Sequence, residues 1–152
     1  MSSLKTYHHR TLVAASLAAV AGFHNSSRVL RDLTPPVMFL KLNRFEPLAE
    51  GSIADFTIWL GPLPVRWVAV HSDVSQDGFT DTQQSGPFKT WRHRHSFKSL
   101  NSRETEVLDE IQLEFSSHWF WGLISRLMWL NLPILFGYRG WVTRRRLNGR
   151  YA

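Results

Sequence analysis

A chain of 152 residues without cysteine is long enough to bury one apolar core, and it can form neither disulfides nor cysteine-based metal sites. The net charge of +6 would favour a nucleic-acid partner if it followed one face, but much of it lies in the C-terminal residues Arg139, Arg144, Arg145, Arg146 and Arg150. At the end of a helix these arginines oppose the negative end of the macrodipole, so we expect no nucleic-acid partner. No linker or low-complexity tract interrupts the sequence, which predicts one domain over residues 1–152.

The N-terminal segment has two interpretations. A basic start followed by the alanine-rich run at 11–22 resembles the apolar part of a secretory signal. Alternatively, the alternation from Leu4 to Leu12 forms a strand, and residues 15–23 form a short helix. Because cleavage would remove a strand from a small sheet, we favour the second interpretation. A cytoplasmic protein is then favoured over a secreted one, although the residues alone do not fix the compartment.

The middle of the chain has the pattern of strands joined by tight turns. A second short helix is expected over residues 26–33, and it ends at Pro35 and Pro36 because the residue before a proline avoids the helical region. Turn residues such as glycine, proline and asparagine then separate apolar, alternating segments. These segments predict six consecutive strands, at 37–45, 52–60, 65–74, 79–84, 88–97 and 104–115.

The C-terminal segment from residue 119 to 138 is almost wholly apolar and long enough to span a bilayer. Arg126 and Pro133 interrupt it, and a charge near the bilayer centre is costly, so we predict a helix buried against the sheet. Ser116 or Ser117 would supply its N-cap. The stripe with helical spacing that we expect to face the sheet comprises Phe120, Leu123, Ile124, Leu127, Leu130, Ile134, Tyr138 and Trp141.

The predicted order of elements defines the fold class. A meander has one face that needs cover, and the long C-terminal helix is the only expected element that is large enough to provide it. We therefore predict an α+β fold with a seven-stranded, curved antiparallel sheet. Two short helices follow the first strand, and one long C-terminal helix encloses a cavity against the sheet.

A motif in the second half of the chain carries a family resemblance. It comprises Phe79-x-Asp81-x-Gln83, Gly86-Pro87-Phe88, Trp91-x-His93-x-His95-x-Phe97 and Thr105-x-x-x-Asp109. The motif resembles the polyketide cyclase/dehydrase-like branch of the START-related superfamily, and Leu33-Thr34-Pro35-Pro36 and Phe136-Gly137-Tyr138-Arg139 are similar to the same branch. Members share the helix-grip fold and bind lipids, sterols, polyketides or quinones. The resemblance therefore implies a helix-grip domain with a ligand cavity, without naming the ligand.

Strand alternation shows which side chains share a face of the sheet. Alternate residues of a strand point the same way, and arginines occupy the opposite face of the segment at 88–97, so its tryptophan and histidines should point inward. A short turn around Asn101 then places Asp109 opposite or diagonal to His93 or His95. The residues that we expect to contact a ligand are Phe79, Asp81, Gln83, Trp91, His93, His95, Phe97, Val107, Asp109 and Ile111.

The polar band across this aromatic wall has three interpretations. It can be a hydrogen-bond network between strands, a set of ligand contacts, or an acid–base site in which His93, His95 and Asp109 transfer protons. A metal site would need a carboxylate such as Asp109 or Asp81 beside the two histidines, and without a third ligand at matched spacing we expect no metal. No glycine-rich phosphate loop is present in the sequence, and we expect no cofactor.

Three hypotheses for the function follow, and the sequence does not decide whether the protein is an enzyme. The leading one is a binding or carrier protein for a hydrophobic small molecule that is lipid-, quinone- or polyketide-like. The alternative is a cofactor-independent cyclase, dehydratase or isomerase that acts on a polyketide-like intermediate by His/Asp acid–base chemistry. The third is a membrane-associated lipid chaperone whose apolar helix and arginine tail make a weak contact with a membrane surface. The oligomeric state does not follow from the sequence.

Overall fold

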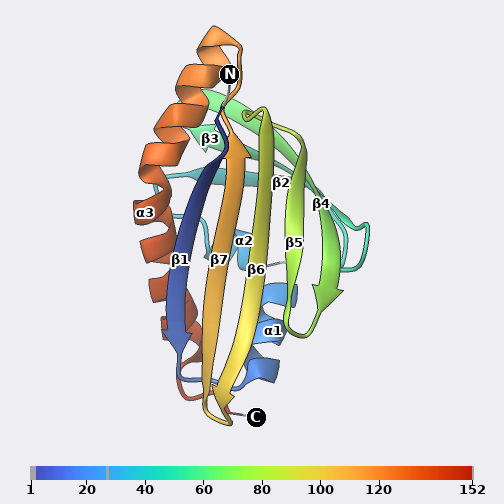
Figure 1. The fold of residues 1–152 in the computed structure, drawn as a ribbon, viewed down its shortest axis with the longest axis vertical. Coiled ribbons are helices and arrows are strands. Elements are labelled where there is room, and N and C mark those ends of the chain that lie inside the picture. Colours follow the sequence, from blue (N-terminus) through green and yellow to red (C-terminus); the bar gives the residue numbers. More distant parts are fainter. Residues whose placement is uncertain (1–2, 27, 152) are drawn as a thin grey trace.

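The computed structural model describes residues 3–26 and 28–151 (Figure 1). Within these residues, seven strands form one sheet in the order β1-β7-β6-β5-β4-β3-β2. The strands are β1 (Lys5–Val13), β2 (Phe39–Phe45), β3 (Ile53–Leu60), β4 (Leu63–Ser75), β5 (Gly78–Ser85), β6 (Thr90–Asn101) and β7 (Glu104–Glu114). The helices are α1 (Leu17–Asn25), α2 (Val29–Asp32) and α3 (Trp119–Leu147).

The sheet is an antiparallel meander, as the turn pattern predicted. Strands β2 to β7 follow one another in space, and β1 pairs with β7 from Lys5 opposite Leu113 to Val13 opposite Thr105. The N-terminal strand is therefore an edge strand. The helix α2 is shorter than the predicted helix over residues 26–33, of which residue 27 lies outside the described residues.

The helix α1 begins within the alanine-rich run. Ser16 is its N-cap, and the Ser16 hydroxyl accepts a hydrogen bond of 3.2 Å from the Ala19 amide, which satisfies one of the free donors of the first turn. All three helices lie on one side of the sheet, with α3 beside β1 and α1 beneath the lower halves of β5 and β6 (Figure 1). They cover the inner, concave face.

Two apolar clusters fill the space between the helices and the sheet. The larger lies under α3 and includes Trp67, Phe88, Trp91, Ile111, Leu113, Leu132 and Phe136. The smaller lies under α1 and includes Val13, Val20, Phe79, Phe97, Val107 and Leu147. Burial of each such large side chain contributes roughly 1.5–3 kcal/mol to folding. The clusters meet at β5, β6 and β7, where the polar residues of the motif are found.

The face that α3 turns toward the sheet differs from the prediction. The buried residues are Gly122, Ser125, Leu132, Phe136, Gly140, Val142, Thr143 and Leu147. Of the stripe expected to face the sheet, Leu123, Leu127, Leu130, Ile134 and Trp141 are exposed. Gly140 lets the helix approach β1 closely. A Cβ atom on Gly140 would lie 2.8 Å from Oγ1 of Thr11, so no larger side chain fits there.

The predicted start of α3 also needs correction. Neither Ser116 nor Ser117 is the N-cap, because His118 occupies that position and makes no side-chain capping bond. The Ser116 hydroxyl instead accepts a hydrogen bond from the His118 amide. By length and composition α3 could cross a bilayer, and only 22% of its most apolar window is buried.

Candidate ligand-binding site and its histidine–aspartate cluster

Strand register brings the predicted polar residues together on the inner face. His95 lies opposite Asp109 on β7 and opposite Phe79 on β5, and His93 lies opposite Asp81. The close approach of β5 to β6 depends on Gly78, whose φ is +137° and whose Cβ would lie only 1.9 Å from the His95 carbonyl oxygen. The prediction that Asp109 falls opposite or diagonal to the histidines is confirmed.

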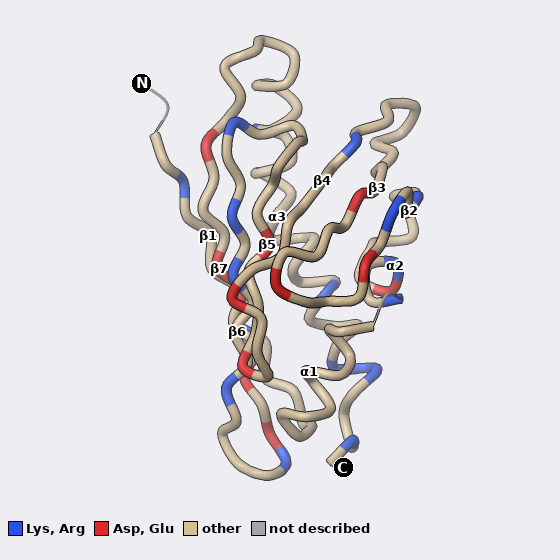
Figure 2. The backbone as a smooth tube through the Cα atoms, turned by 90° about the vertical axis from the view of Figure 1, so that its right-hand side faces the viewer, with Lys and Arg blue, Asp and Glu red and all other residues tan. Residues whose placement is uncertain are grey.

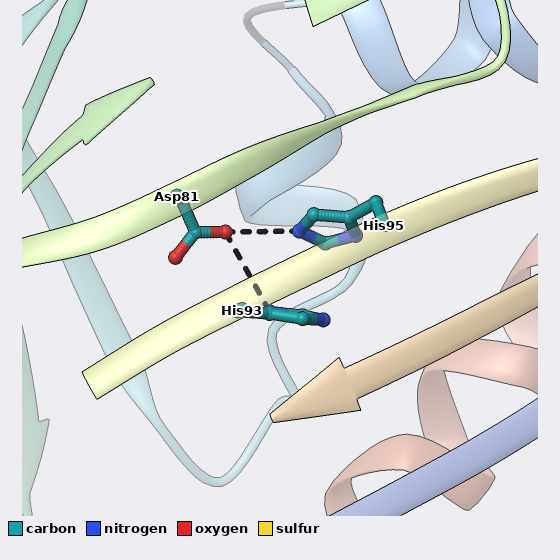
Figure 3. Close-up of side chains that lie close together, drawn as sticks. All are labelled: Asp81, His93 and His95. Atoms are coloured by element: carbon teal, nitrogen blue, oxygen red, sulfur yellow. Dashed lines mark hydrogen bonds and ion pairs between the residues drawn. The ribbon is translucent and has the colours of Figure 1, made fainter. Parts of the chain in front are cut away.

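The four side chains form one cluster of hydrogen bonds and ion pairs, which we call the His–Asp cluster (Asp81, His93, His95 and Asp109). Oδ1 of Asp109 lies 2.8 Å from Nε2 of His93 and 3.1 Å from Nδ1 of His95. Oδ2 of Asp81 lies 2.9 Å from Nε2 of His95 and 3.6 Å from Nδ1 of His93 (Figure 3). The two imidazole rings are 3.7 Å apart between centroids. Every ring nitrogen therefore faces a carboxylate.

Burial and mutual charge set the protonation of the cluster. Burial lowers the pKa of His93, and the charge of His95 lowers it further. Burial also opposes charge on His95, but the hydrogen bonds to Asp109 and Asp81 outweigh it and raise the pKa of His95 to about 9. The imidazoles more than offset the burial of Asp81 and lower its pKa to about 2, and they hold the pKa of Asp109 well below its usual range. At neutral pH, His95 is the charged histidine.

Two further groups near the cluster were not recognised as site residues in the sequence. Arg139 lies within electrostatic reach of both aspartates, and its guanidinium is 5.2 Å from the centroid of the Phe136 ring. His24 on α1 is buried, and its ring centroid is 6.4 Å from that of His95. Burial lowers the pKa of His24 to about 4, so it is neutral near pH 7. The sequence pattern places Arg139 in the basic tail, although it also ends the segment Phe136-Gly137-Tyr138-Arg139 that resembles the family.

Three members of the cluster could hold a metal ion. One ligand atom each from Asp81, His93 and His95 lies within 4.8 Å of the others. Two imidazoles and one carboxylate are donors that suit zinc. A metal ion would have to displace the proton of His95, whose pKa of about 9 favours the protonated form at neutral pH.

The sequence predicted a cavity between the sheet and the C-terminal helix, and the structure has an open cleft beside the cluster. The cleft encloses about 450 Å³ between α1 and the β4–β5 turn, and it is partly open to solvent. It is lined by Ala18, Ala21, Gly22, Asn25, Leu48, Val74, Ser75, Gln76, Phe79 and Phe97. A second hollow of about 370 Å³ lies on the other side of α1, against the end of α3. In front of His93 the ring of Phe136 occupies the space, 5.4 Å away between centroids.

The residues predicted to contact a ligand therefore occupy different environments. Phe79 and Phe97 line the cleft, and Phe79 stacks on His95. Trp91 and Ile111 belong to the larger apolar cluster, and Val107 belongs to the smaller one. The Gln83 side chain closes the turn before β6, because its amide donates to the Phe88 carbonyl oxygen (2.9 Å) and its Oε1 accepts from the Phe88 amide (3.2 Å).

The His–Asp cluster is a network of hydrogen bonds and ion pairs that lies next to an apolar cleft. His93 is 3% exposed, so the network has little contact with solvent. Its hydrogen bonds tie β5, β6 and β7 together. The Phe79 ring, which lines the cleft, covers one face of the His95 imidazole.

Comparison with known proteins shows the fold. No protein-family model and no curated protein matches the sequence. Among solved structures, a Thermus thermophilus protein has a TM-score of 0.68 at 15% identity, and the match covers 91% of this chain and 97% of that one. A Streptomyces aromatase/cyclase has a TM-score of 0.68 at 12% identity, and the match covers 95% of this chain and 96% of that one.

A third similar structure is norcoclaurine synthase from Thalictrum flavum in complex with dopamine and hydroxybenzaldehyde. Its TM-score is 0.68 at 14% identity, and the match covers 99% of this chain and 91% of that one. The curved seven-stranded sheet, the two short helices and the long C-terminal helix agree with these structures over almost the full chain. The chain therefore has the helix-grip fold, as its order of elements and its motif predicted.

Proposed function

We propose that the chain is one ligand-binding domain that holds a hydrophobic small molecule in the cleft between α1 and the β4–β5 turn. The observation that carries this proposal is the composition of the cleft. Its volume of about 450 Å³ lies within the range of roughly 300–1,000 Å³ that is usual for ligand sites. Apolar side chains line most of it, including Leu48, Val74, Phe79 and Phe97.

A few polar groups at the cleft provide orientation. Asn25, Ser75 and Gln76 lie among the lining residues and can hydrogen-bond a polar end of the ligand. Such a mixture, a mostly apolar wall with a few polar groups, is typical of pockets for lipid-, quinone- or polyketide-like molecules. Affinity would come from burial of apolar surface at roughly 25 cal/mol per Å².

An acid–base enzyme of the same fold is the second candidate. The observation that favours it is the His–Asp cluster directly behind Phe79, with a protonated His95 between two carboxylates. If the Phe79 ring turned aside, His95 could donate a proton to a carbonyl oxygen in the cleft. The aromatase/cyclase and norcoclaurine synthase are enzymes of this fold, which agrees with a cyclase acting on a polyketide-like intermediate. Binding remains the first candidate because the imidazoles of the cluster are already engaged with carboxylates.

The chain offers a matched pair of variants for a test of the cleft. Ala21 lines the cleft, whereas Ala19 on the same helix lines the second hollow. Ala21→Phe would fill the cleft and should weaken binding of a fluorescent probe, anilinonaphthalene sulfonate, by about tenfold or more. Ala19→Phe, the same change on the same helix, should leave probe binding within about twofold. Equal probe binding by both variants would contradict the proposal.

The second candidate is tested by His95→Gln with a set of aromatic polyketide-like intermediates. The enzyme hypothesis predicts turnover by the parent chain that His95→Gln abolishes while probe binding persists. The carrier hypothesis predicts probe binding by both proteins and turnover by neither. Native mass spectrometry of the protein purified from its own host would show which molecule accompanies it.

A further inference from the structure

The outer face of α3 carries a continuous apolar stripe. It comprises Trp119, Leu123, Leu127, Leu130, Ile134 and Trp141, all of which are exposed, and we call it the α3 stripe. At about 3.6 residues per turn, the six side chains fall within an arc of about 80° on the helix surface. Leu130 is 70% exposed and Ile134 is 72% exposed. A run of large apolar side chains on one surface marks a contact with another apolar body.

The packing of α3 fixes this face outward. The opposite side of the helix holds Leu132 and Phe136 in the larger apolar cluster, and Gly140 lies against Thr11 on β1. Rotation of the helix to bury the stripe would remove Leu132 and Phe136 from the core and drive a larger side chain into the space that Gly140 now occupies beside Thr11. Insertion of α3 across a bilayer would remove Phe136 from the core. The stripe is therefore available only to a partner on the outside of the folded domain.

The charge around the stripe indicates that its partner is an anionic surface. Residues 119–147 contain five arginines and no aspartate or glutamate, as the sequence shows. Arg126 is exposed near the first half of the stripe, and Arg144 and Arg145 are exposed at its end. Basic positions also gather toward the C-terminus in Figure 2. An anionic surface complements this helix. Two copies packed stripe to stripe would instead bring arginines together without an acidic side chain on either α3.

The ends of the stripe have the residues that favour a lipid interface. Trp119 and Trp141 lie at its two ends, and the guanidinium of Arg145 is 5.3 Å from the Trp141 ring centroid. Tryptophan prefers the headgroup level of a bilayer, and arginine beside it can contact lipid phosphates. A helix with an apolar face and a basic edge lies in the plane of such an interface.

We propose that the protein docks on the surface of an anionic lipid bilayer through the α3 stripe, with α3 parallel to the membrane and its C-terminal arginines against the headgroups. The contact involves neither the cleft nor the His–Asp cluster, so it is independent of the proposed function. It would bring a domain that binds a hydrophobic molecule to the lipid phase from which such a molecule is obtained.

Vesicle flotation of the full chain tests the proposal. The protein should float with vesicles that contain phosphatidylserine, float less with pure phosphatidylcholine, and be released by high salt. Leu130→Asp with Ile134→Asp should weaken vesicle binding by at least about tenfold. Arg144→Gln with Arg145→Gln should weaken binding to anionic vesicles by about twenty-five-fold, because each arginine near a membrane surface contributes a factor of about five.

A control pair lies on a different surface. Val37 and Phe39 are 85% and 75% exposed, so Val37→Asp with Phe39→Asp removes a comparable exposed apolar surface away from α3. Flotation by this control at the parent level, with unchanged unfolding midpoints for all variants, supports the proposal. Equal loss in the control and the stripe variant would overturn it, as would absence of the parent protein from the vesicle fraction.

Two other occupants of the stripe give different results. A second copy would appear as a dimer in size-exclusion chromatography that Leu130→Asp with Ile134→Asp dissociates, and this would overturn the membrane proposal. A spanning helix would resist extraction by both high salt and alkaline carbonate, which would also overturn it. Ala21→Phe, which tests the cleft, should leave flotation unchanged, so failure of one proposal is distinguishable from failure of the other.

Discussion

The ring of Phe79 stacks on the imidazole of His95, with centroids 4.3 Å apart and planes inclined by 23°. Phe79 also lines the open cleft. Phe79 therefore contacts both the cleft and the buried His–Asp cluster. The relationship links the apolar wall that would bind a ligand to His95, the histidine of the cluster whose pKa is raised to about 9.

Truncation of Phe79 should destabilise the protein strongly. Phe79→Ala removes a buried ring that contacts His95, His71 and Phe97, and such losses typically cost about 3–5 kcal/mol of unfolding free energy. Phe39→Ala is the matched control, because Phe39 is exposed and the same change there should cost less than about 0.5 kcal/mol. Urea unfolding followed by tryptophan fluorescence measures both. Similar costs at the two positions would show that Phe79 is not packed as described.

Loss of one carboxylate from the buried cluster should lower the free energy of unfolding. Asp109→Asn leaves the charge of His95 with only Asp81 as a partner, and breaking a buried ion pair in this way typically costs about 3–5 kcal/mol. The neighbouring change Glu110→Gln lies on the opposite face of β7 and should cost less than about 1 kcal/mol. Unfolding in urea compares the two variants, and an equal cost would contradict the hydrogen-bond network.

The stability of the protein should fall at both ends of the pH range. Because the pKa of His95 is raised from 6.5 to about 9, its contribution is complete below pH 6.5 and is lost as the pH rises through about 9. The pKa of Asp81 is lowered from 3.8 to about 2, so its contribution is present above pH 3.8 and is lost as the pH falls through about 2. Nitrogen-15 NMR of the imidazoles measures the first change directly. A His95 ring that titrates near 6.5 would contradict the assignment.

Two glycines on α3 should respond in opposite directions to the same substitution. Gly140→Ala places a methyl group 2.8 Å from Oγ1 of Thr11 and should destabilise the fold despite the better helix propensity of alanine. A Cβ atom on Gly137 would have no neighbouring atom within 4 Å, so Gly137→Ala should stabilise the fold by up to about 1 kcal/mol. Thermal unfolding of both variants measures the difference. If Gly140→Ala were the more stable of the two, α3 would not pack on β1 as described.

Zinc should have little effect on the protein at neutral pH. The three atoms that could hold it belong to Asp81, His93 and His95, and the proton on His95 competes with the metal. We expect equimolar zinc to leave the unfolding temperature unchanged at pH 7. A zinc-dependent rise that His95→Gln removes would show that the cluster is a metal site.

Strand alternation predicted the inner face well. In β6 and β7 the inward residues alternate with arginines and glutamates, so the period of two alone separates the faces, and Trp91, His93 and Asp109 all point inward. The turn between the strands then fixed the register of His95 opposite Asp109. Strand alternation and a short turn are local features, so they can be predicted from the sequence without knowledge of tertiary contacts.

The sequence was less informative about α3 and the cleft. Large apolar residues occupy both sides of this helix, so their spacing favoured the wrong face, whereas the buried side combines Leu132 and Phe136 with small residues such as Gly140, which lies against β1. The cleft depends on how α1 packs against the β4–β5 turn, a contact between segments distant in sequence that no periodicity encodes. Arg139 joins the electrostatics of the cluster only because α3 has this orientation.

The most direct test of the proposed binding site is a map of side-chain NMR shifts during titration with anilinonaphthalene sulfonate. We predict saturable shifts at Leu48, Val74, Phe79 and Phe97, with Ile111 and Leu113 in the closed core unaffected. Shifts confined to Leu127, Leu130 and Ile134 on α3, or the absence of any saturable shift at Phe79 and Phe97, would contradict a ligand site in the cleft.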